Sequence, residues 1–461
     1  METISYANLK VEGFPYRKLL SVQISHRPNE HGTAVLEGEV DADQAQDLVQ
    51  RVDETLRVSL VTTAEGQPER LFSGCVKDIA LRQENAYSIV TLSLYTTSRL
   101  LDVTKKKKTY QQISQTYGQI ITDSISDKGD LHMMVTDKAI GRLIMKYNET
   151  DWEFAMRMAS QLDSPLVADI AAQRPQIYVG LSPSRKTVKL ESSPFSYVRN
   201  VDPLSALSGS MAQDFSGEQV QSYEYAFIGD TVLMNGKSAR IKGVRAALTD
   251  GILSMSYELM QANGSLTGIA APKASSKASG KMMKGIVKNV MRDKVQVHIT
   301  DIDKEYDGGG DWWFPFSTAY SSSDGSGWYC MPERGDDVRV FFPSGQEGEA
   351  FAASSVFSQP PLNPRHKCWK APGGKEILLT DEGMYIIGKA GKIYINLTDE
   401  KGIEIYSDKE ISIMSDTKVS ICAASEVDIV ASNEIIIGTE EAYIDLNKSS
   451  AILAASEVLI N

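Results

Sequence analysis

The sequence predicts a mainly β protein with helical insertions, a small barrel, and a C-terminal intertwined β-helix built from three copies of the chain. Three patterns support this fold class: an eight-residue repeat that begins at Gly402, short alternating strands in residues 285–358, and alternating stretches in the first hundred residues. With 461 residues, the chain has room for about three domains of ~100–200 residues each.

The first part of the chain, residues 1–261, consists mainly of predicted strands. Residues 19–25 and 87–95 alternate apolar with polar side chains, which is the pattern of a strand that buries one face. We interpret residues 1–110 and 111–261 as two domains, and we expect the second to contain helices.

Three helical patterns interrupt these strands, at residues 43–55, 111–126 and 151–162. The last is the clearest, because Thr150 and Glu153 have the spacing of a capping box, in which two side chains satisfy free N–H groups at a helix start. Its apolar side chains share one face, which predicts packing against a core.

A linker and a small barrel are predicted next. Residues 262–284 are rich in Ala, Ser, Gly and Lys and poor in large apolar side chains, which is typical of a linker. Residues 285–358 contain several short strands separated by turns, which favours a closed barrel of the OB type. The aromatic group at 312–316 could stack on nucleic acid, but few Lys or Arg lie near it, so we expect a core and domain-interface role.

The residues from Gly402 onward repeat with a period of eight. The second and fourth positions of each block are Ile or Val, the residue between them is usually polar, and the second half of the block is small or polar. This alternation indicates a short strand with one inward face, followed by a bend. The predicted inward residues of the first five blocks are Ile403, Ile405, Ile411, Ile413, Val419, Ile421, Val427, Ile429, Ile435 and Ile437.

The repeat changes its register after Thr439. Ile444, Ile452 and Ile460 keep the spacing of eight and complete the predicted core, but they are shifted by one residue. A one-residue slip turns side chains to the other face of a strand, so we expect a bulge or altered turn at residues 440–443. A weaker copy precedes the repeat, and we interpret residues 359–401 as a transition and the start of the needle that residues 402–461 form.

A period of eight is too short for a full coil of a single-chain β-helix. It suits one side of a prism whose other sides come from partner chains, and a three-fold arrangement would close the prism and leave few open strand edges. The alternatives are a single-chain solenoid and a flat sheet, but both would expose long Ile-rich edges that promote aggregation.

Composition excludes several classes of function. The net charge of −12 argues against nucleic acid binding, and the 11 acidic residues and 3 lysines from Gly402 onward place −8 of it on the repeat. The basic run Lys105–Lys108 predicts a solvated loop or, alternatively, a docking patch for an acidic partner. The four cysteines and five histidines are scattered, so we expect unpaired, mostly buried thiols, no metal site and no cofactor.

The N-terminal residues lack the pattern of a secretory signal, and no apolar run approaches the ~20 residues that span a bilayer. We therefore expect synthesis in the bacterial cytoplasm, followed by incorporation into a particle or export by another route.

Four stretches resemble the VgrG family and the equivalent hub-and-spike proteins of contractile phage tails and tailocins. They occur in the order of that family's parts and ahead of the repeat, so the resemblance covers essentially the whole chain. The stretches are Leu71–Gly74, Lys146–Phe154, Phe227–Asp230 followed by Ala239–Val244, and Trp328–Phe342.

The resemblance implies a homotrimer with a wide hub of β-barrel-like domains, formed by residues 1–110 and 111–261, an OB barrel, and a narrow needle. In this family the hub caps an inner tube, and sheath contraction drives the needle through a target envelope. Tube and baseplate proteins are the implied partners.

Two departures from the family matter. About 45 residues separate Phe357 from Gly402, which leaves no room for the effector domain that some members carry. The needle contains no histidine, so the iron site at some phage spike tips cannot form from this chain. Either the tip closes without metal, or a separate PAAR-like protein covers it.

Catalysis has little support, because the sequence contains neither G-x-S-x-G nor H-E-x-x-H. We therefore expect that this protein is not an enzyme. The remaining alternatives are a spike that degrades peptidoglycan and a trimeric tail fibre that binds a surface receptor.

The inward assignment predicts a needle that resists SDS and heat as a trimer. Replacing Ile413, Val419 or Ile421 with Asp would place a charge in the shared core and is expected to abolish trimerisation. A measurement of mass in solution checks this, and variants that remain trimeric would show that the assignment is wrong.

Overall fold

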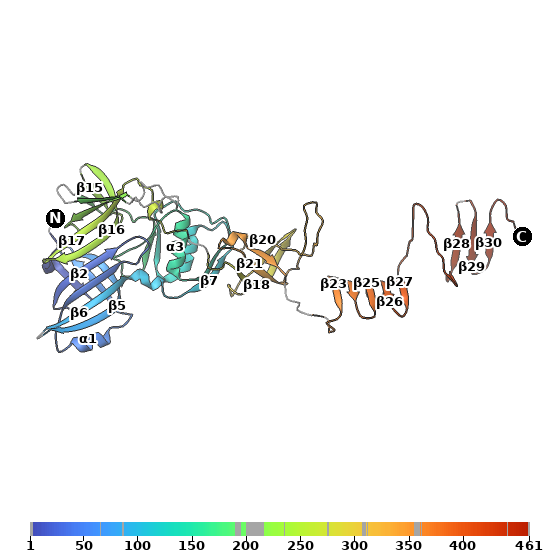
Figure 1. Ribbon diagram of the computed structural model, residues 1–461, viewed down its shortest axis with the longest axis horizontal. Helices are drawn as coiled ribbons and strands as arrows, with labels where there is room; N and C mark the ends of the chain where they lie inside the picture. The colour runs from blue at the N-terminus through green and yellow to red at the C-terminus, as the bar shows by residue number, and fades with distance from the viewer. Residues whose placement is uncertain are drawn as a thin grey trace. The chain divides into compact units, whose positions relative to one another are not determined.

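The computed structural model describes residues 3–459, except 65, 85–86, 190–194, 200–215, 235, 274–275, 307–309, 311, 355–359, 361 and 440. The chain folds as two compact units, residues 1–356 and 357–461. Strands dominate both units, and the α-helices lie in the first (Figure 1). The prediction of a mainly β protein with helical insertions is confirmed.

A twelve-stranded sheet is the largest part of the first unit. Ten strands follow one path of neighbours, β1-β4-β5-β6-β3-β2-β16-β17-β14-β13, while β15 pairs with β16 and β12 with β15. The strands are β1 (Leu9–Glu12), β2 (Lys18–His26), β3 (Thr33–Val40), β4 (Arg57–Thr62), β5 (Glu69–Glu84), β6 (Tyr87–Thr96), β12 (Thr187–Lys189), β13 (Phe195–Arg199), β14 (Ser216–Ser222), β15 (Thr231–Met234), β16 (Lys237–Thr249) and β17 (Ile252–Gln261).

The seam of this sheet is the antiparallel pair β2–β16, in which Ile24 lies opposite Ala246. It joins strands that are more than two hundred residues apart in the sequence. Burial alternates along β3, where Ala34, Leu36 and Val40 lie in a core that also receives Tyr257 from β17. Strand alternation therefore builds one core under both halves of the sheet.

The two stretches of the family resemblance that fall here have tight backbone geometry. Phe72 is fully buried on β5, and a Cβ at Gly74 would lie 2.1 Å from the Tyr95 carbonyl oxygen. Gly229 has a φ of +94°, which L side chains rarely adopt. The carboxylate of the next residue, Asp230, accepts hydrogen bonds from the backbone N–H groups of Phe227 and Arg185 and so holds this turn.

The three predicted helical patterns all contain helices, which are shorter than their predicted ranges. They are α1 (Ala45–Arg51), α2 (Tyr117–Ile125) and α3 (Asp151–Gln161), and short 3-10 helices occur at Tyr6–Asn8, Thr97–Leu101, Ser126–Lys128, Thr267–Ile269 and Glu347–Glu349. The capping box of α3 is present: the Thr150 side chain accepts from the Glu153 N–H at 3.0 Å, and the Glu153 carboxylate accepts from the Thr150 N–H at 2.9 Å.

Small sheets accompany α2 and α3. Strands β10, β11 and β8 form one sheet, and β7 pairs with β9. The strands are β7 (Lys106–Tyr110), β8 (Asp130–Met133), β9 (Ile144–Glu149), β10 (Leu166–Ala168) and β11 (Gln176–Val179). The basic run Lys105–Lys108 was predicted to be a loop, and this is wrong. Its last three residues belong to β7, because Lys106 and Lys108 find acidic partners and the strand continues into buried Thr109 and Tyr110.

Strand β9 is buried on both faces. Ile144 packs with the helices in one core, whereas Leu143, just before the strand, and Met145 pack in the core of the barrel that follows. Because successive side chains of a strand point to opposite faces, this one segment belongs to two cores.

The predicted small barrel is a five-stranded sheet in the order β20-β19-β18-β21-β22. An isolated parallel bridge between Phe316 and Ala352 connects its two ends, so the sheet closes on itself. Phe314 is fully buried and Trp312 packs against the same core, which confirms the core role predicted for the aromatic group. Assignment to the OB type stays a prediction. The strands are β18 (Lys281–Met291), β19 (Lys294–His298), β20 (Phe314–Pro315), β21 (Asp337–Phe342) and β22 (Phe351–Ala353).

The segment predicted to be a linker, residues 262–284, is packed in part. Ala278 is fully buried in the barrel core, and β18 begins at Lys281, inside the predicted range. Lys277 also pairs with Glu153 at 3.1 Å. Small side chains therefore allow close contact here, although their composition indicated a flexible connection.

The second unit contains two antiparallel meanders (Figure 1). Residues 408–433 between them form no strand within the chain, although the repeat predicts strands there. The strands are β23 (Lys367–Ala371), β24 (Lys375–Leu379), β25 (Gly383–Lys389), β26 (Ile393–Thr398), β27 (Gly402–Ser407), β28 (Glu434–Gly438), β29 (Tyr443–Asn447) and β30 (Ala451–Ala454). Among the described residues, no helix has the length and apolar character needed to cross a membrane.

Removing the Thr150 side chain tests the capping box. In Thr150→Ala, α3 loses its N-cap, and Asp102 loses a hydrogen bond from Thr150 Oγ1 at 2.6 Å. We expect the helix to be destabilised by about 1–2 kcal/mol, measured as faster hydrogen exchange over residues 151–161. Thr150→Ser keeps the oxygen and should restore protection, whereas unchanged exchange in the Ala variant would contradict the role.

Candidate functional site

The sheet β23–β27 of the second unit has one continuous apolar face. Strand pairing places Trp369 opposite Ile377, Ile386 opposite Ile395, and Ile395 opposite Ile405. Residues directly opposite each other lie on the same face of a sheet, so each pair extends the same surface. We call this surface the apolar face; its members are Trp369, Ile377, Leu379, Met384, Ile386, Ile393, Ile395, Leu397, Ile403 and Ile405.

The sequence analysis identified only the later part of the apolar face. It recognised Ile403 and Ile405 and a weaker preceding copy, but it missed Trp369 and Met384. The alternation of Met384 and Ile386 with Tyr385 was a usable signal. The lengths between these strands do not follow the eight-residue period, so a search for the repeat did not find them.

The apolar side chains are exposed in a single chain. Ile403 and Ile413 are each 72% exposed, and Trp369 is 52% exposed. All of the predicted inward residues from Ile403 to Ile429 are exposed, as are Ile437, Ile444 and Ile452; Ile435 is half-buried, and Ile460 lies outside the described residues. A contiguous apolar surface of this kind marks a site of protein association.

The second meander brings several predicted residues together and separates one. Ile437 pairs with Ile444, so the one-residue slip after Thr439 keeps both on one face. Ile444 pairs with Leu453, and Ile452 lies opposite Asp445. Within the chain, Ile452 therefore does not share the face of Ile444 as the sequence analysis expected. The reason is the turn after Asn447, which sets the register so that an even-numbered residue of β29 lies opposite an odd-numbered residue of β30. Two residues that are eight apart in the sequence therefore lie on opposite faces of the sheet.

The segment between the two meanders has unpaired backbone. Within the described part of the chain, none of the N–H or C=O groups of residues 409–433 bonds to another backbone group. Instead, this segment has local hydrogen bonds to side chains. For example, Ser415 Oγ accepts a hydrogen bond from the Thr417 N–H at 3.3 Å. Extended chain with free donors and acceptors is suited to strand pairing with another molecule.

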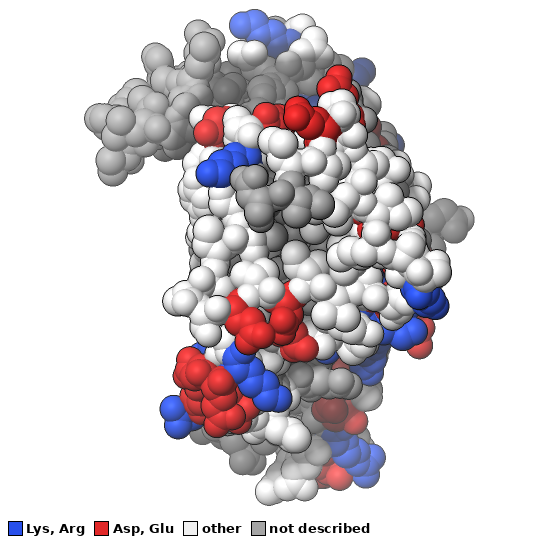
Figure 2. All heavy atoms as spheres, turned by 90° about the vertical axis from the view of Figure 1, so that its right-hand side faces the viewer, with Lys and Arg blue, Asp and Glu red and all other residues white. Residues whose placement is uncertain are grey.

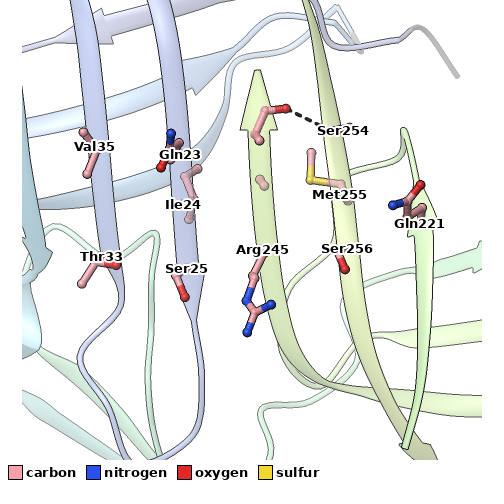
Figure 3. Close-up of a pocket in the computed structure, with 12 residues that line it drawn as sticks. Gln23, Ile24, Ser25, Thr33, Val35, Gln221, Arg245, Ser254, Met255 and Ser256 are labelled. Atoms are coloured by element: carbon pink, nitrogen blue, oxygen red, sulfur yellow. Dashed lines mark hydrogen bonds between the residues drawn. The ribbon is translucent and has the colours of Figure 1, made fainter. Parts of the chain in front are cut away.

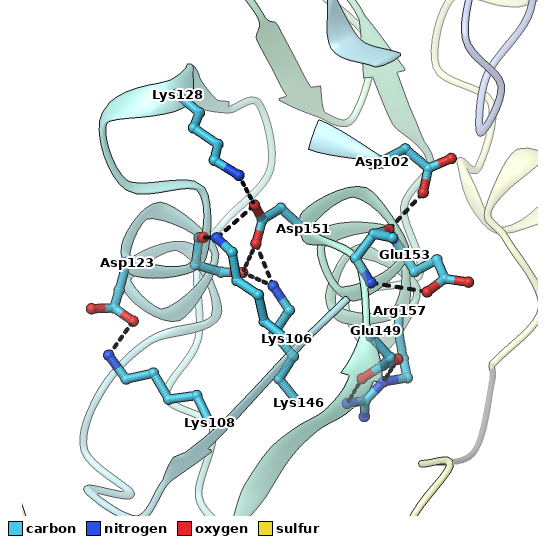
Figure 4. A network of polar contacts seen from close by, with 12 residues as sticks. Asp102, Lys106, Lys108, Asp123, Lys128, Lys146, Glu149, Asp151, Glu153 and Arg157 are labelled. Atoms are coloured by element: carbon cyan, nitrogen blue, oxygen red, sulfur yellow. Dashed lines mark hydrogen bonds and ion pairs between the residues drawn. The ribbon is translucent and has the colours of Figure 1, made fainter. Parts of the chain in front are cut away.

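A buried arginine fastens the barrel to the rest of the first unit. Arg157 on α3 donates to both carboxylate oxygens of Glu149 at 2.8 Å and to Glu347 of the barrel at 2.9 Å, and each of the three side chains is 4% exposed (Figure 4 shows the pair with Glu149). Burial alone would lower the pKa of Arg157, but the hydrogen bonds and charge of Glu149 outweigh it and raise the pKa. A second link is Gln111, whose amide donates to the Val297 carbonyl at 3.0 Å.

A second charge cluster surrounds Asp151 (Figure 4). Its carboxylate pairs with Lys106 at 2.8 Å, with Lys128 at 3.4 Å and with the buried Lys146, which also donates to Ser124 at 2.9 Å. Burial raises the pKa of Asp151, but hydrogen bonds from Lys106 and Lys146 outweigh it and lower the pKa. Burial lowers the pKa of Lys146 despite the pairing with Asp151. These groups hold one another in place.

A shallow groove of about 400 Å³ crosses the seam of the large sheet (Figure 3). Small polar side chains line it, among them Ser25 on β2 and Ser254 and Ser256 on β17, and Arg245 lies at the seam.

Lysines and arginines occur in small groups interspersed with acidic side chains on the face drawn in Figure 2.

The structure describes no cluster of three or more His, Cys, Asp or Glu side chains that could hold a metal ion. The cysteines are unpaired, as predicted, but of the four only Cys75 is buried. Cys330 and Cys422 are exposed because they lie in the barrel's long loop and in the unpaired segment of the repeat.

No family model matches the sequence, and no curated protein matches it. Among solved structures, the chain is similar to the E. coli c3393 protein, described as "a component of the type VI secretion system" with similarity to the T4 bacteriophage tail proteins gp27 and gp5. The TM-score is 0.56 at 12% identity, over 75% of this chain and 98% of that one.

Two tail proteins are also similar. One is from prophage MuSo2 of Shewanella oneidensis, with a TM-score of 0.42, 12% identity, and coverage of 55% of this chain and 97% of that one. The other is from Neisseria meningitidis, with a TM-score of 0.43, 11% identity, and coverage of 58% and 98%. The E. coli structure, with the TM-score above 0.5, establishes the shared fold over the 75% of this chain that it covers. The mainly β hub expected from the resemblance is thereby confirmed, whereas the trimeric β-helix stays a prediction.

Removing the carboxylate of Asp151 tests the buried charge cluster. Asp151→Asn leaves Lys146 buried without its counter-charge, so we expect a loss of about 3–5 kcal/mol in the free energy of unfolding, measured by urea denaturation of the full chain. Asp163→Asn is the matched control, because Asp163 and its partner Lys273 are both more than half exposed and their pair should contribute at most about 1 kcal/mol. Equal losses in both variants would contradict the buried role of Asp151.

Proposed function

We propose that this chain is the homotrimeric central hub and spike of a contractile injection machine. In this role it caps the inner tube and pierces a target envelope when the sheath contracts. The observation that carries the proposal is the second unit, which exposes Ile and Leu side chains, such as Ile403 and Leu397, on ordered strands. The type VI role stated for the E. coli structure supports it.

Three copies would remove this exposure. The apolar faces of three β23–β27 sheets can pack around a three-fold axis, each sheet forming one side of a prism. Burial of an Ile or Val side chain contributes roughly 1.5–3 kcal/mol, and the gain is repeated along the unit and in each copy, against the entropy lost on ordering. The result is a stiff rod whose core is shared by all three chains.

The middle of the repeat requires more than face-to-face packing. Because residues 409–433 have no backbone partners among the described residues of their own chain, we propose that they pair with strands of the other two copies, so the chains intertwine there. Such pairing satisfies the free N–H and C=O groups and closes the open edges. The trimeric β-helix predicted from the octads would thus begin after the self-paired sheet β23–β27.

The acidic exterior suits penetration rather than adhesion. Glu404 and Asp428 alternate with the inward residues of their octads and would face solvent, where their charge is repelled by anionic envelopes. We therefore propose a mechanical role without catalysis. A glycan-degrading spike and a receptor-binding fibre remain the alternatives. Release of peptidoglycan fragments would favour the first, and stable attachment of the isolated protein to whole target cells would favour the second.

The buried ion pairs of the first unit suit a junction that transmits force between the helices and the barrel. Arg157 and Glu347 connect α3 to the barrel, so force on one part is transmitted to the other without relying on a flexible linker. Tube and baseplate proteins are the proposed partners of the hub, and a PAAR-like protein is the proposed partner at the far end. The assembled protein would leave the bacterial cytoplasm in a particle or by export.

The mass of the full chain in solution tests the trimer. We expect a species of three chains of 50.6 kDa each, measured by light scattering after size exclusion. Ser412→Asp serves as the matched control for Ile413→Asp, since the two residues are adjacent in one octad and only Ile413 is assigned inward. The Ser412 variant should remain trimeric, and a monomeric wild type would overturn the proposal.

A further inference from the structure

The face of the sheet β23–β27 opposite the apolar face carries a different set of side chains. Pairing places Tyr385 opposite Asn396, Asn396 opposite Glu404, and Tyr394 opposite Tyr406. We call this surface the outer face, because burying the apolar face in a trimer leaves it open to solvent. The argument below therefore rests on the proposed function.

Two hollows open on the outer face, and Tyr385 lines both. The first has a volume of about 570 Å³ and is lined by Tyr385, Asn396, Thr398 and Glu404, with acidic turn residues at its rim. It lies where Gly383 and Gly402 pair with Thr398 and carry no side chain. The second, of about 350 Å³, adds the apolar side chains of Leu378 and Ile387 and the imidazole of His366. Asp381 and Glu382 line both, so the hollows form one trough on either side of the tyrosine.

The polar groups of the trough are held in place by the sheet. The Glu404 carboxylate accepts from the Tyr394 hydroxyl at 3.2 Å and from the Asn396 amide at 3.1 Å. The rings of Tyr394 and Tyr406 stack with centroids 5.3 Å apart beside this pair. A rigid floor of this kind costs little conformational entropy when a ligand binds.

The chemistry of the trough selects its ligand. A tyrosine ring offers an apolar face for the C–H groups of a pyranose, while carboxylate, amide and hydroxyl groups on both sides can bond to sugar hydroxyls. The rim carries four carboxylates and one ammonium group, so its net negative charge would repel anionic polymers; these residues are Asp381, Glu382, Asp399, Glu400 and Lys401. We infer that the trough binds an uncharged glycan strand, with one sugar ring on Tyr385 and its neighbours in the two hollows.

Binding of soluble oligosaccharides to the full-length chain tests this inference. Calorimetry with chitohexaose and maltohexaose measures affinity, and co-sedimentation with chitin beads measures binding to an uncharged polymer. We expect millimolar or tighter binding of at least one hexasaccharide. Tyr385→Ala should weaken it at least tenfold, while Tyr385→Phe, which keeps the ring, should retain most of it.

Lys370→Ala is the matched control, because Lys370 lies on the outer face but lines neither hollow. Its affinity should equal that of the wild type. A trimeric wild type that binds none of the probes, or a trimeric Tyr385→Ala variant with unchanged affinity, would overturn the inference. So would selective binding of poly-L-lysine in place of the sugars. A monomeric wild type would instead overturn the proposed function, so the two failures are distinguishable.

Discussion

The apolar face of the second unit is exposed in a single chain, and this exposure limits the states in which the protein can be stable in water. Side chains such as Ile403 and Ile405 lie on a well-formed strand, yet they are 72% and 60% exposed, because the described residues of one chain do not cover them. Water-exposed Ile-rich strands with open edges are prone to aggregation, so a stable protein must bury them against something. Copies of the same chain are the simplest partner, because they carry the same surface and a closed symmetry limits the assembly.

The first unit differs, because its apolar side chains form three hydrophobic cores within one chain. Strand β9 contributes to two cores, and Arg157 and Asp151 hold charged partners on either side of it. Buried ion pairs are weak contributors to net stability, but losing one partner is costly, so they favour one arrangement of helices and barrel over others. The contrast between the buried cores of the first unit and the exposed apolar face of the second supports the proposed roles of hub and needle.

Much of the fold followed from local patterns. The capping box at Thr150 and Glu153, the alternation along β3 and the short strands of the barrel each depend on neighbours within a few residues, and the structure contains all three. Composition was less informative where packing decided the outcome. The Ala- and Ser-rich segment contains the buried Ala278, and the lysine run lies partly in a strand whose acidic partners, Asp123 and Asp151, are distant in sequence.

By itself, the sequence determined the alternation of apolar and polar side chains along the octads, the acidity of the C-terminal repeat and the strand-rich class, because each depends on residues close together along the chain. Only the tertiary structure decided that the apolar face extends back to Trp369 and that Ile452 turns away from Ile444. It also decided that residues 409–433 have no backbone partners in the described part of their own chain. Strand register depends on the geometry of the turns, and strand pairing depends on which strands come into contact. The period of a repeat specifies neither the turn geometry nor the pairing.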